Sequence, residues 1–105
     1  MQGIQRLALL AAAVLALGGG HAMAAAEFFP ESSTDALYEE DIDDLDCYGL
    51  WHARNEIYAR HGFRFTGARE IKEFGAGTNA TVTLNPVEEA NVQLLESAAN
   101  KNGCG

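Results

Sequence analysis

The chain is short of basic residues, of cysteine and of long apolar segments, and each shortage disfavours a class of function. Seven lysines and arginines stand against fifteen aspartates and glutamates, so 105 residues carry a formal net charge of −8. Because nucleic acids and anionic membrane surfaces repel such a protein, binding to either is disfavoured. A cationic ligand, or solubility outside the cytoplasm, suits this charge better.

The scarcity of cysteine and of clustered ligands argues against a metal or redox centre. The chain has two cysteines, Cys47 and Cys104, and no C-x-x-C pair, which disfavours redox catalysis and a zinc site. The acidic run Tyr38–Asp46 lacks the central glycine and final glutamate of a calcium loop. We therefore expect no metal and no cofactor. In an exported protein the two cysteines predict one disulfide, which would make the helices beside them antiparallel.

The one long apolar run, Leu7–Leu17, predicts export. Its eleven residues are too few to span a bilayer as a resident helix. An A-x-A cleavage site, Ala22–Ala24, follows it, and cleavage is expected after Ala24 or Ala26. We therefore predict a signal peptide over residues 1–26 and one domain over residues 27–104. After cleavage that domain is periplasmic or secreted and is not embedded in a membrane.

The stretch Leu50–Gly62 is the longest run of helical periodicity in the exported part. Asp46 is a suitable N-cap, and Gly62 can take the left-handed conformation that ends a helix. At 100° per residue, Arg54 and His61 fall in the middle of the apolar face. By the same count, three residues should face water: His52, Glu56 and Ala59.

The decapeptide Ala53–Gly62, ARNEIYARHG, resembles the signature of the YARHG domain, a small domain of bacterial exported proteins. The similarity extends upstream to Phe28–Ser32 and downstream to Phe65 and the helix start at Asn85. Gly75–Gly77 stands where that family usually carries a Trp-Tyr pair. The resemblance implies a fold and a cell-envelope or secreted setting, and it implies no particular reaction.

Further helices are expected on both sides of this stretch. Tyr38–Asp46 has a thin apolar stripe, and Ala68–Phe74 is a short helix for which Thr66 is the expected cap. A last helix begins with Asn85 as the cap, Pro86 and Glu88, and ends at Asn102-Gly103. The expected fold is mainly α, a bundle of about three short helices with one disulfide. The alternative is α+β, with a short two-stranded element that includes Thr81–Leu84.

An arginine on an apolar face needs fixed acceptors. We expect Arg54 to donate to Glu88, with Asn91 and the carbonyls of the last turn completing the network. Such a cluster either fixes the register of two helices or lines a pocket for a small polar ligand, and the first is favoured. Eight residues are candidates for this polar core or binding surface: Arg54, Asn55, Tyr58, Arg60, His61, Gly62, Glu88 and Asn91.

The expected function is a non-catalytic binding or accessory module that acts on an envelope protein or a cell-wall component. One alternative is a small hydrolase-like enzyme with His61 as general base and Glu88 or Glu56 as its partner. Another is a purely structural or stress-related envelope protein. Trp51, Tyr48 and Tyr58 form a stacking patch or the rim of the core, and the second is favoured.

Overall fold

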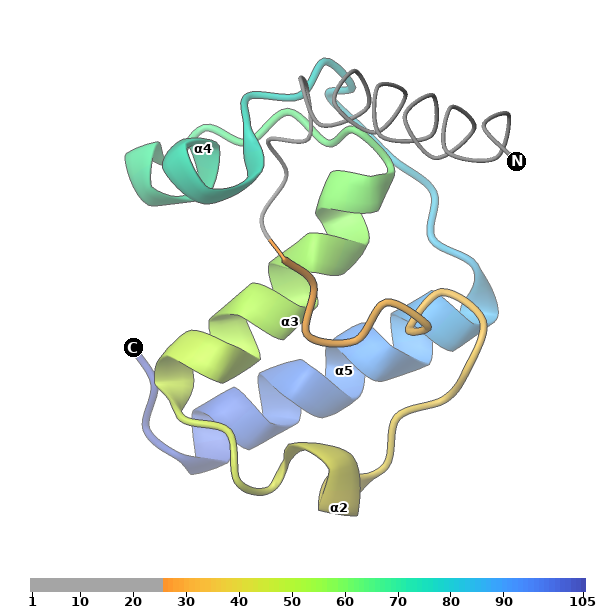
Figure 1. Ribbon diagram of the computed structural model, residues 1–105, viewed down its shortest axis with the longest axis vertical. Coiled ribbons are helices and arrows are strands. Elements are labelled where there is room, and N and C mark those ends of the chain that lie inside the picture. The colour runs from red at the N-terminus through yellow and green to blue at the C-terminus, as the bar shows by residue number, and fades with distance from the viewer. Residues whose placement is uncertain (1–25) are drawn as a thin grey trace, which may run out of the picture.

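The computed structural model describes residues 26–105, which form four helices joined by irregular segments (Figure 1). The helices are α2 (Glu39–Ile42), α3 (Cys47–Arg60), α4 (Ala68–Phe74) and α5 (Pro86–Lys101). The predicted signal peptide lies, except for Ala26, outside the described residues and stays a prediction. Within residues 26–105, no helix is long and apolar enough to cross a membrane.

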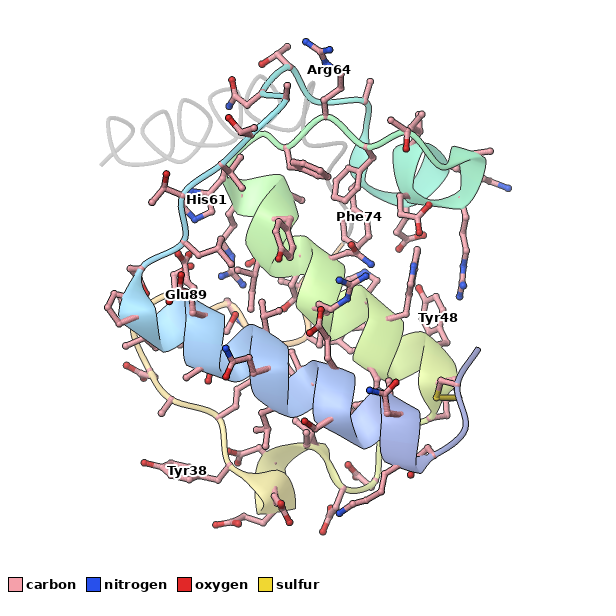
Figure 2. All side chains as sticks on the ribbon, turned by 180° about the vertical axis from the view of Figure 1, so that it is seen from behind. Tyr38, Tyr48, His61, Arg64, Phe74 and Glu89 are labelled. Carbon is pink, nitrogen blue, oxygen red and sulfur yellow. A yellow bond between two sulfur atoms is a disulfide. The ribbon has the colours of Figure 1, made fainter. Side chains whose placement is uncertain are left out.

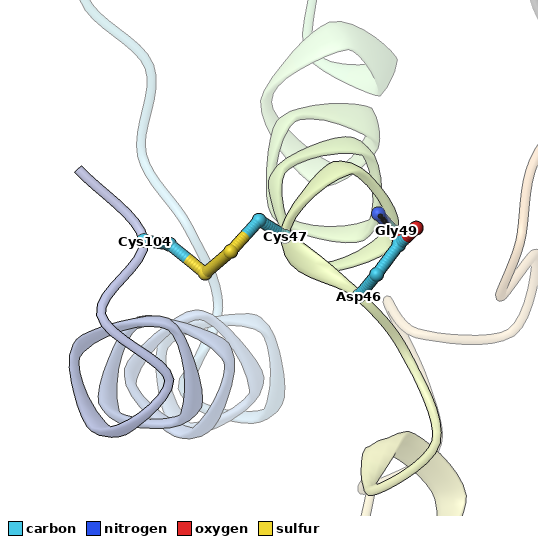
Figure 3. Close-up of a disulfide and its surroundings, with 4 residues drawn as sticks. All are labelled: Asp46, Cys47, Gly49 and Cys104. Carbon is cyan, nitrogen blue, oxygen red and sulfur yellow. Dashed lines mark hydrogen bonds between the residues drawn. A yellow bond between two sulfur atoms is a disulfide. The ribbon is translucent and has the colours of Figure 1, made fainter.

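The ends of α3 follow the expected capping chemistry. The Asp46 side chain accepts a hydrogen bond from the Gly49 nitrogen at 2.8 Å (Figure 3). Gly62 has a φ of +70°, in the left-handed region that favours glycine. The predicted cap and the predicted terminator are both confirmed, and the helix starts three residues before Leu50.

The start of α5 is also as predicted. Asn85 accepts from the Glu88 nitrogen at 2.8 Å, and the Glu88 side chain accepts from the Asn85 nitrogen at 2.9 Å. This reciprocal pair is a capping box, and Pro86 occupies the first helical position. The carboxylate of Glu88 is therefore oriented by the start of its own helix, in addition to its contacts with other segments.

Helices α3 and α5 lie side by side and antiparallel, and they form the body of the domain (Figure 1). The predicted disulfide joins Cys47 at the start of α3 to Cys104 just after α5, with a Cα–Cα distance of 5.6 Å (Figure 3). Six buried apolar residues form the core: Ile42, Leu50, Ala53, Ile57, Val92 and Leu95. The mainly α fold is confirmed.

The segments around α4 differ from the expectation in two respects. The residue that caps α4 is Gly67, and no side chain caps this helix, so the assignment of Thr66 is wrong. Among the described residues the two-stranded alternative is reduced to one isolated parallel bridge, between Phe63 and Asn79. Thr81–Leu84 has no regular secondary structure.

An N-terminal arm, residues 27–37, crosses α3 and then runs beside the start of α5 (Figure 1). The side chains of Phe29 and Leu37 pack against the core. The arm contains no helix and no strand. Three hydrogen bonds within the arm form turns, and side chains of α3 and α5 supply partners for several of its other main-chain polar groups.

Candidate functional site

Glu56 holds the beginning of the arm. Its carboxylate is 1% exposed, and its two oxygens accept hydrogen bonds from the nitrogens of Phe28 at 2.9 Å and Phe29 at 2.7 Å. Nδ1 of His52 lies 2.9 Å from Oε1, and a guanidinium nitrogen of Arg60 lies 3.6 Å from Oε2. A buried carboxylate is stable here because four polar partners replace its hydration.

Arg60 holds the middle of the arm with its whole guanidinium group. Its Nε donates to the Glu27 carboxylate at 2.9 Å, and one terminal nitrogen donates to the Ser33 hydroxyl at 2.6 Å. The other terminal nitrogen donates to the Phe29 carbonyl at 2.8 Å and the Ser32 hydroxyl at 3.0 Å. This planar arrangement of donors suits arginine and has no equivalent in lysine.

Asn91 on α5 holds the end of the arm. Its side-chain oxygen accepts from the Leu37 nitrogen at 2.8 Å, and its amide nitrogen donates to the carbonyls of Ser32 at 2.9 Å and Asp35 at 3.0 Å. The side chain is 1% exposed. Asn91, the polar residue in the apolar stripe of α5, thus binds main-chain groups of the arm. It does not pair with Arg54, whose partner is Glu96.

His61 and Glu88 form a pair between the end of α3 and the start of α5. Nε2 of His61 lies 2.9 Å from Oε2 of Glu88, which also accepts from the Ser33 hydroxyl at 2.7 Å. Burial alone would raise the pKa of Glu88. The hydrogen bonds from Ser33, the Asn85 nitrogen and His61 outweigh burial and hold this pKa below its usual value.

The same geometry gives Ser33 no support as a nucleophile. Its hydroxyl donates to Glu88 and accepts from Arg60, and the imidazole of His61 faces the carboxylate. A triad requires the hydroxyl to donate to the imidazole and the carboxylate to orient the far side of the ring.

Figure 2 shows His61 at the end of α3 nearest the start of α5, far from Tyr48 near the disulfide.

The structure corrects the expectation for Arg54. Its side chain is 35% exposed and its guanidinium pairs with Glu96 at 3.2 Å, so the predicted bond to Glu88 is not formed. The cause is that Glu88 lies near the start of α5, beside the end of α3. Antiparallel packing places Arg54, in the middle of α3, beside a later turn of α5.

The predicted water-facing side of α3 is also corrected. His52 and Glu56 are each 1% exposed, because the arm and α4 cover this side. The ring of His52 stacks on Phe28 at 4.3 Å, and its Nε2 lies 3.2 Å from Glu73 of α4. With Glu56 on Nδ1, both ring nitrogens of His52 face carboxylates.

The remaining motif residues have local roles. The amide of Asn55 donates to the Trp51 carbonyl at 2.9 Å, one turn earlier. Tyr58 is half-buried and its ring lies 5.6 Å from that of Phe63. Gly62 accepts hydrogen bonds at its carbonyl from Thr78 and Asn79, which connects the end of α3 to the segment after α4.

Aromatic rings form one continuous cluster between the arm, α3 and α4, joined by contacts of 4.3–6.2 Å. Its members are Phe28, Tyr48, Trp51, His52, Tyr58, Phe63, Phe65 and Phe74. Most of these rings are buried or half-buried, whereas Phe28 and Tyr48 are 40% and 44% exposed. The predicted role as core and rim thus describes Tyr58 and Trp51, and Tyr48 belongs to the surface.

Hydrophobic periodicity could not predict that side chains of α3 and α5 bind the arm, because a segment without helix or strand has no periodic pattern. The one sequence signal is the presence of two serines, Ser32 and Ser33, in a chain whose helices also carry an arginine, a histidine and a glutamate on or beside their apolar faces. Every buried side-chain nitrogen and oxygen among the described residues has a hydrogen-bond partner. The motif is therefore a closed internal network in this part of the chain.

Comparison with known proteins identifies the family. The sequence matches the YARHG domain over residues 25–100, which is most of the chain and all four helices as far as Asn100. No curated protein and no solved structure matches the chain significantly. YARHG is a small domain of the extracellular type, and the disulfide fits an exported protein. The chain therefore belongs to the YARHG domain family.

Proposed function

We propose that this protein is an exported, non-catalytic binding or accessory module of the bacterial cell envelope. Its partner on this proposal is an envelope protein or a cell-wall component. One observation carries the proposal: the polar side chains of the motif face the protein's own arm and α5. Glu56, Arg60 and His61 contact residues of those segments at 2.6–3.0 Å. The motif then serves as the scaffold, and the open surface is left for binding.

The arrangement of the charged candidates supports the same conclusion. A hydrolase-like site needs its base, its partner carboxylate and a cation to converge on an open cleft. His61 and Glu88 are paired with each other, whereas Arg54 lies on a different surface with Glu96. The grooves that Arg54 lines contain neither His61 nor Glu88.

The proposal is tested by capture from bacterial envelope extract on the immobilised, oxidised domain. A module should retain a saturable partner whose mass is unchanged after elution, as measured by mass spectrometry. The same domain, reduced and alkylated, is the control without the disulfide. Purified cell-wall material incubated with the free domain should likewise yield no new products.

A variant distinguishes the module from the enzyme. His61→Asn removes the imidazole that contacts Glu88, and circular dichroism tests whether the variant is folded. Binding should persist in this variant. New cell-wall products that form with the wild type and disappear in His61→Asn would overturn the proposal, and so would the absence of any saturable partner.

A further inference from the structure

A groove of about 590 Å³ runs between α3, the end of α5 and α4. This volume falls in the usual range of small-ligand sites, about 300–1,000 Å³. Leu50, Leu95 and Ala99 make its apolar floor, and the Cys47–Cys104 disulfide closes one end. The groove lies away from the internal network of His61 and Glu88.

This groove is less acidic than the chain as a whole, because two arginines line it with one acidic side chain and the C-terminal residue Gly105. Two arginines, Arg54 and Arg69, line it together, and Glu96 is the only carboxylate side chain among its described lining residues. The pair of Arg54 with Glu96 is 35% and 50% exposed, and exposed pairs of this kind are weak. Among the described residues no salt bridge engages Arg69. Arg69 therefore makes no direct ion pair among these residues, and the neighbouring carboxylate of Glu70 acts on it through longer-range electrostatics.

Arg69 is nevertheless held in place. Its guanidinium carbon lies 3.9 Å from the centroid of the Trp51 ring, a cation–π contact. The indole nitrogen donates to Glu70 at 3.0 Å, which fixes the orientation of the ring beneath the guanidinium. A stacked guanidinium keeps the N–H groups of its edge free, and that edge matches the two oxygens of a carboxylate.

The same stacking excludes one common ligand class. A sugar binds an exposed indole by lying flat on its face, but Arg69 covers one face of Trp51. The rings of Tyr48 and Phe74 lie 5.6 Å from the indole and crowd it further. A carboxylate that approaches the edge of Arg69 displaces none of these groups.

We propose that this groove binds the carboxylate end of a short peptide, with Arg69 as the bidentate donor and Arg54 as the second cation. The apolar floor takes the small side chain next to the carboxylate, and Asn100 at the rim offers an amide to the peptide main chain. This proposal rests on the binding function proposed above and names its ligand class.

Trp51 is the single tryptophan of the chain, so its indole N–H gives one identifiable signal in NMR spectra, from a ring that lines this groove and stacks on Arg69. The probe is acetyl-Ala-Ala-Ala with a free carboxylate, titrated into the full oxidised domain. We expect a saturable shift with a Kd on the order of 1 mM or tighter. The same peptide as the C-terminal amide should bind at least about tenfold more weakly, since charged hydrogen bonds are the strong ones.

Arg69→Gln should weaken binding of the acid at least about tenfold, because it removes the charge and the paired donors. Lys72→Gln is the matched control, since it removes a cation from the same helix outside the groove. Equal binding of the acid and the amide, or unchanged binding by Arg69→Gln, would overturn the proposal. Glucuronate or acetate that binds as well as the tripeptide would overturn the peptide assignment.

The two proposals fail separately. If Arg69→Gln still captures the envelope partner and the tripeptide does not bind, the groove assignment is wrong and the binding function stands. If the tripeptide binds through Arg69 but no envelope partner is captured, the groove stands and the proposed partner class fails.

Discussion

The nitrogen of Phe29 lies 2.7 Å from Oε2 of Glu56, a carboxylate that is 1% exposed and twenty-seven residues away in the sequence. The Phe28 nitrogen donates to the other carboxylate oxygen of Glu56 at 2.9 Å. The central helix thus binds the main chain of the arm with a side chain of the motif, much as a receptor binds an extended peptide.

Glu56→Gln should therefore lower the free energy of unfolding by about 2–4 kcal/mol, because an amide N–H₂ group would face backbone N–H donors and the charge opposite His52 and Arg60 would be lost. Urea unfolding followed by circular dichroism measures this change. Glu89→Gln, an exposed change on α5, should stay within about 0.5 kcal/mol of the wild type.

Arg60→Lys should release the arm, although the charge is kept. A lysine cannot reproduce the donors that reach Glu27, Ser33 and the Phe29 carbonyl, so we expect a loss of about 2–3 kcal/mol. Amide exchange at Phe28 and Phe29 should quicken before that of the core. Arg64→Lys is the control, since Arg64 makes one exposed hydrogen bond at 3.3 Å. Unchanged exchange in Arg60→Lys would contradict this role.

Glu88 should make the stability fall in acid. Its hydrogen bonds hold its pKa below that of an exposed glutamate, about 4.3, so the unfolded chain binds more protons between the two pKa values. This contribution is fully present above about pH 5 and is lost as the pH falls through the lower pKa. Urea unfolding from pH 6 to pH 3 should show a flatter pH profile for Glu88→Gln, whereas Glu89→Gln should keep the wild-type slope.

Arg54→Gln should change the free energy of unfolding by less than about 1 kcal/mol, because the pair with Glu96 is exposed. This outcome is opposite to the one that the helical projection predicts, in which Arg54 is the buried anchor. A loss as large as that of Glu56→Gln would restore the buried role of Arg54.

Reduction of the disulfide should cost about 4 kcal/mol on the chain-entropy model, since the two cysteines are 57 residues apart. The comparison is between the oxidised domain and a Cys47→Ser/Cys104→Ser variant, measured by thermal and urea unfolding. A variant as stable as the oxidised protein would show that the arm and the core suffice.

The parts of the fold that local chemistry determines could be predicted from the sequence. Asp46, Gly62 and the Asn85–Glu88 capping box act within one or two turns of their own positions, and the disulfide follows from having two cysteines in an exported chain. The bounds of α4, Ala68–Phe74, also agree with the prediction.

The faces of α3 could not be predicted by the same means. A projection at 100° per residue assumes one buried face, but α3 is covered by α5 on one side and by the arm and α4 on another. His52 and Glu56 therefore lie inside, and Arg54 lies at an edge. The sequence suggested the pairing of His61 with Glu88 only for a hydrolase-like site, because periodicity does not specify the register of α3 against α5.

The Cys47–Cys104 bond is also a wall of the groove that Arg54 and Arg69 line. In the cytoplasm, where thiols are kept reduced, Cys47 and Cys104 are not bonded to each other. The start of α3 and the end of α5 are then free to separate. The surface is completed by oxidation outside the cytoplasm. If the groove binds peptide carboxylates as proposed, the reduced chain lacks the finished groove, and binding depends on formation of the disulfide.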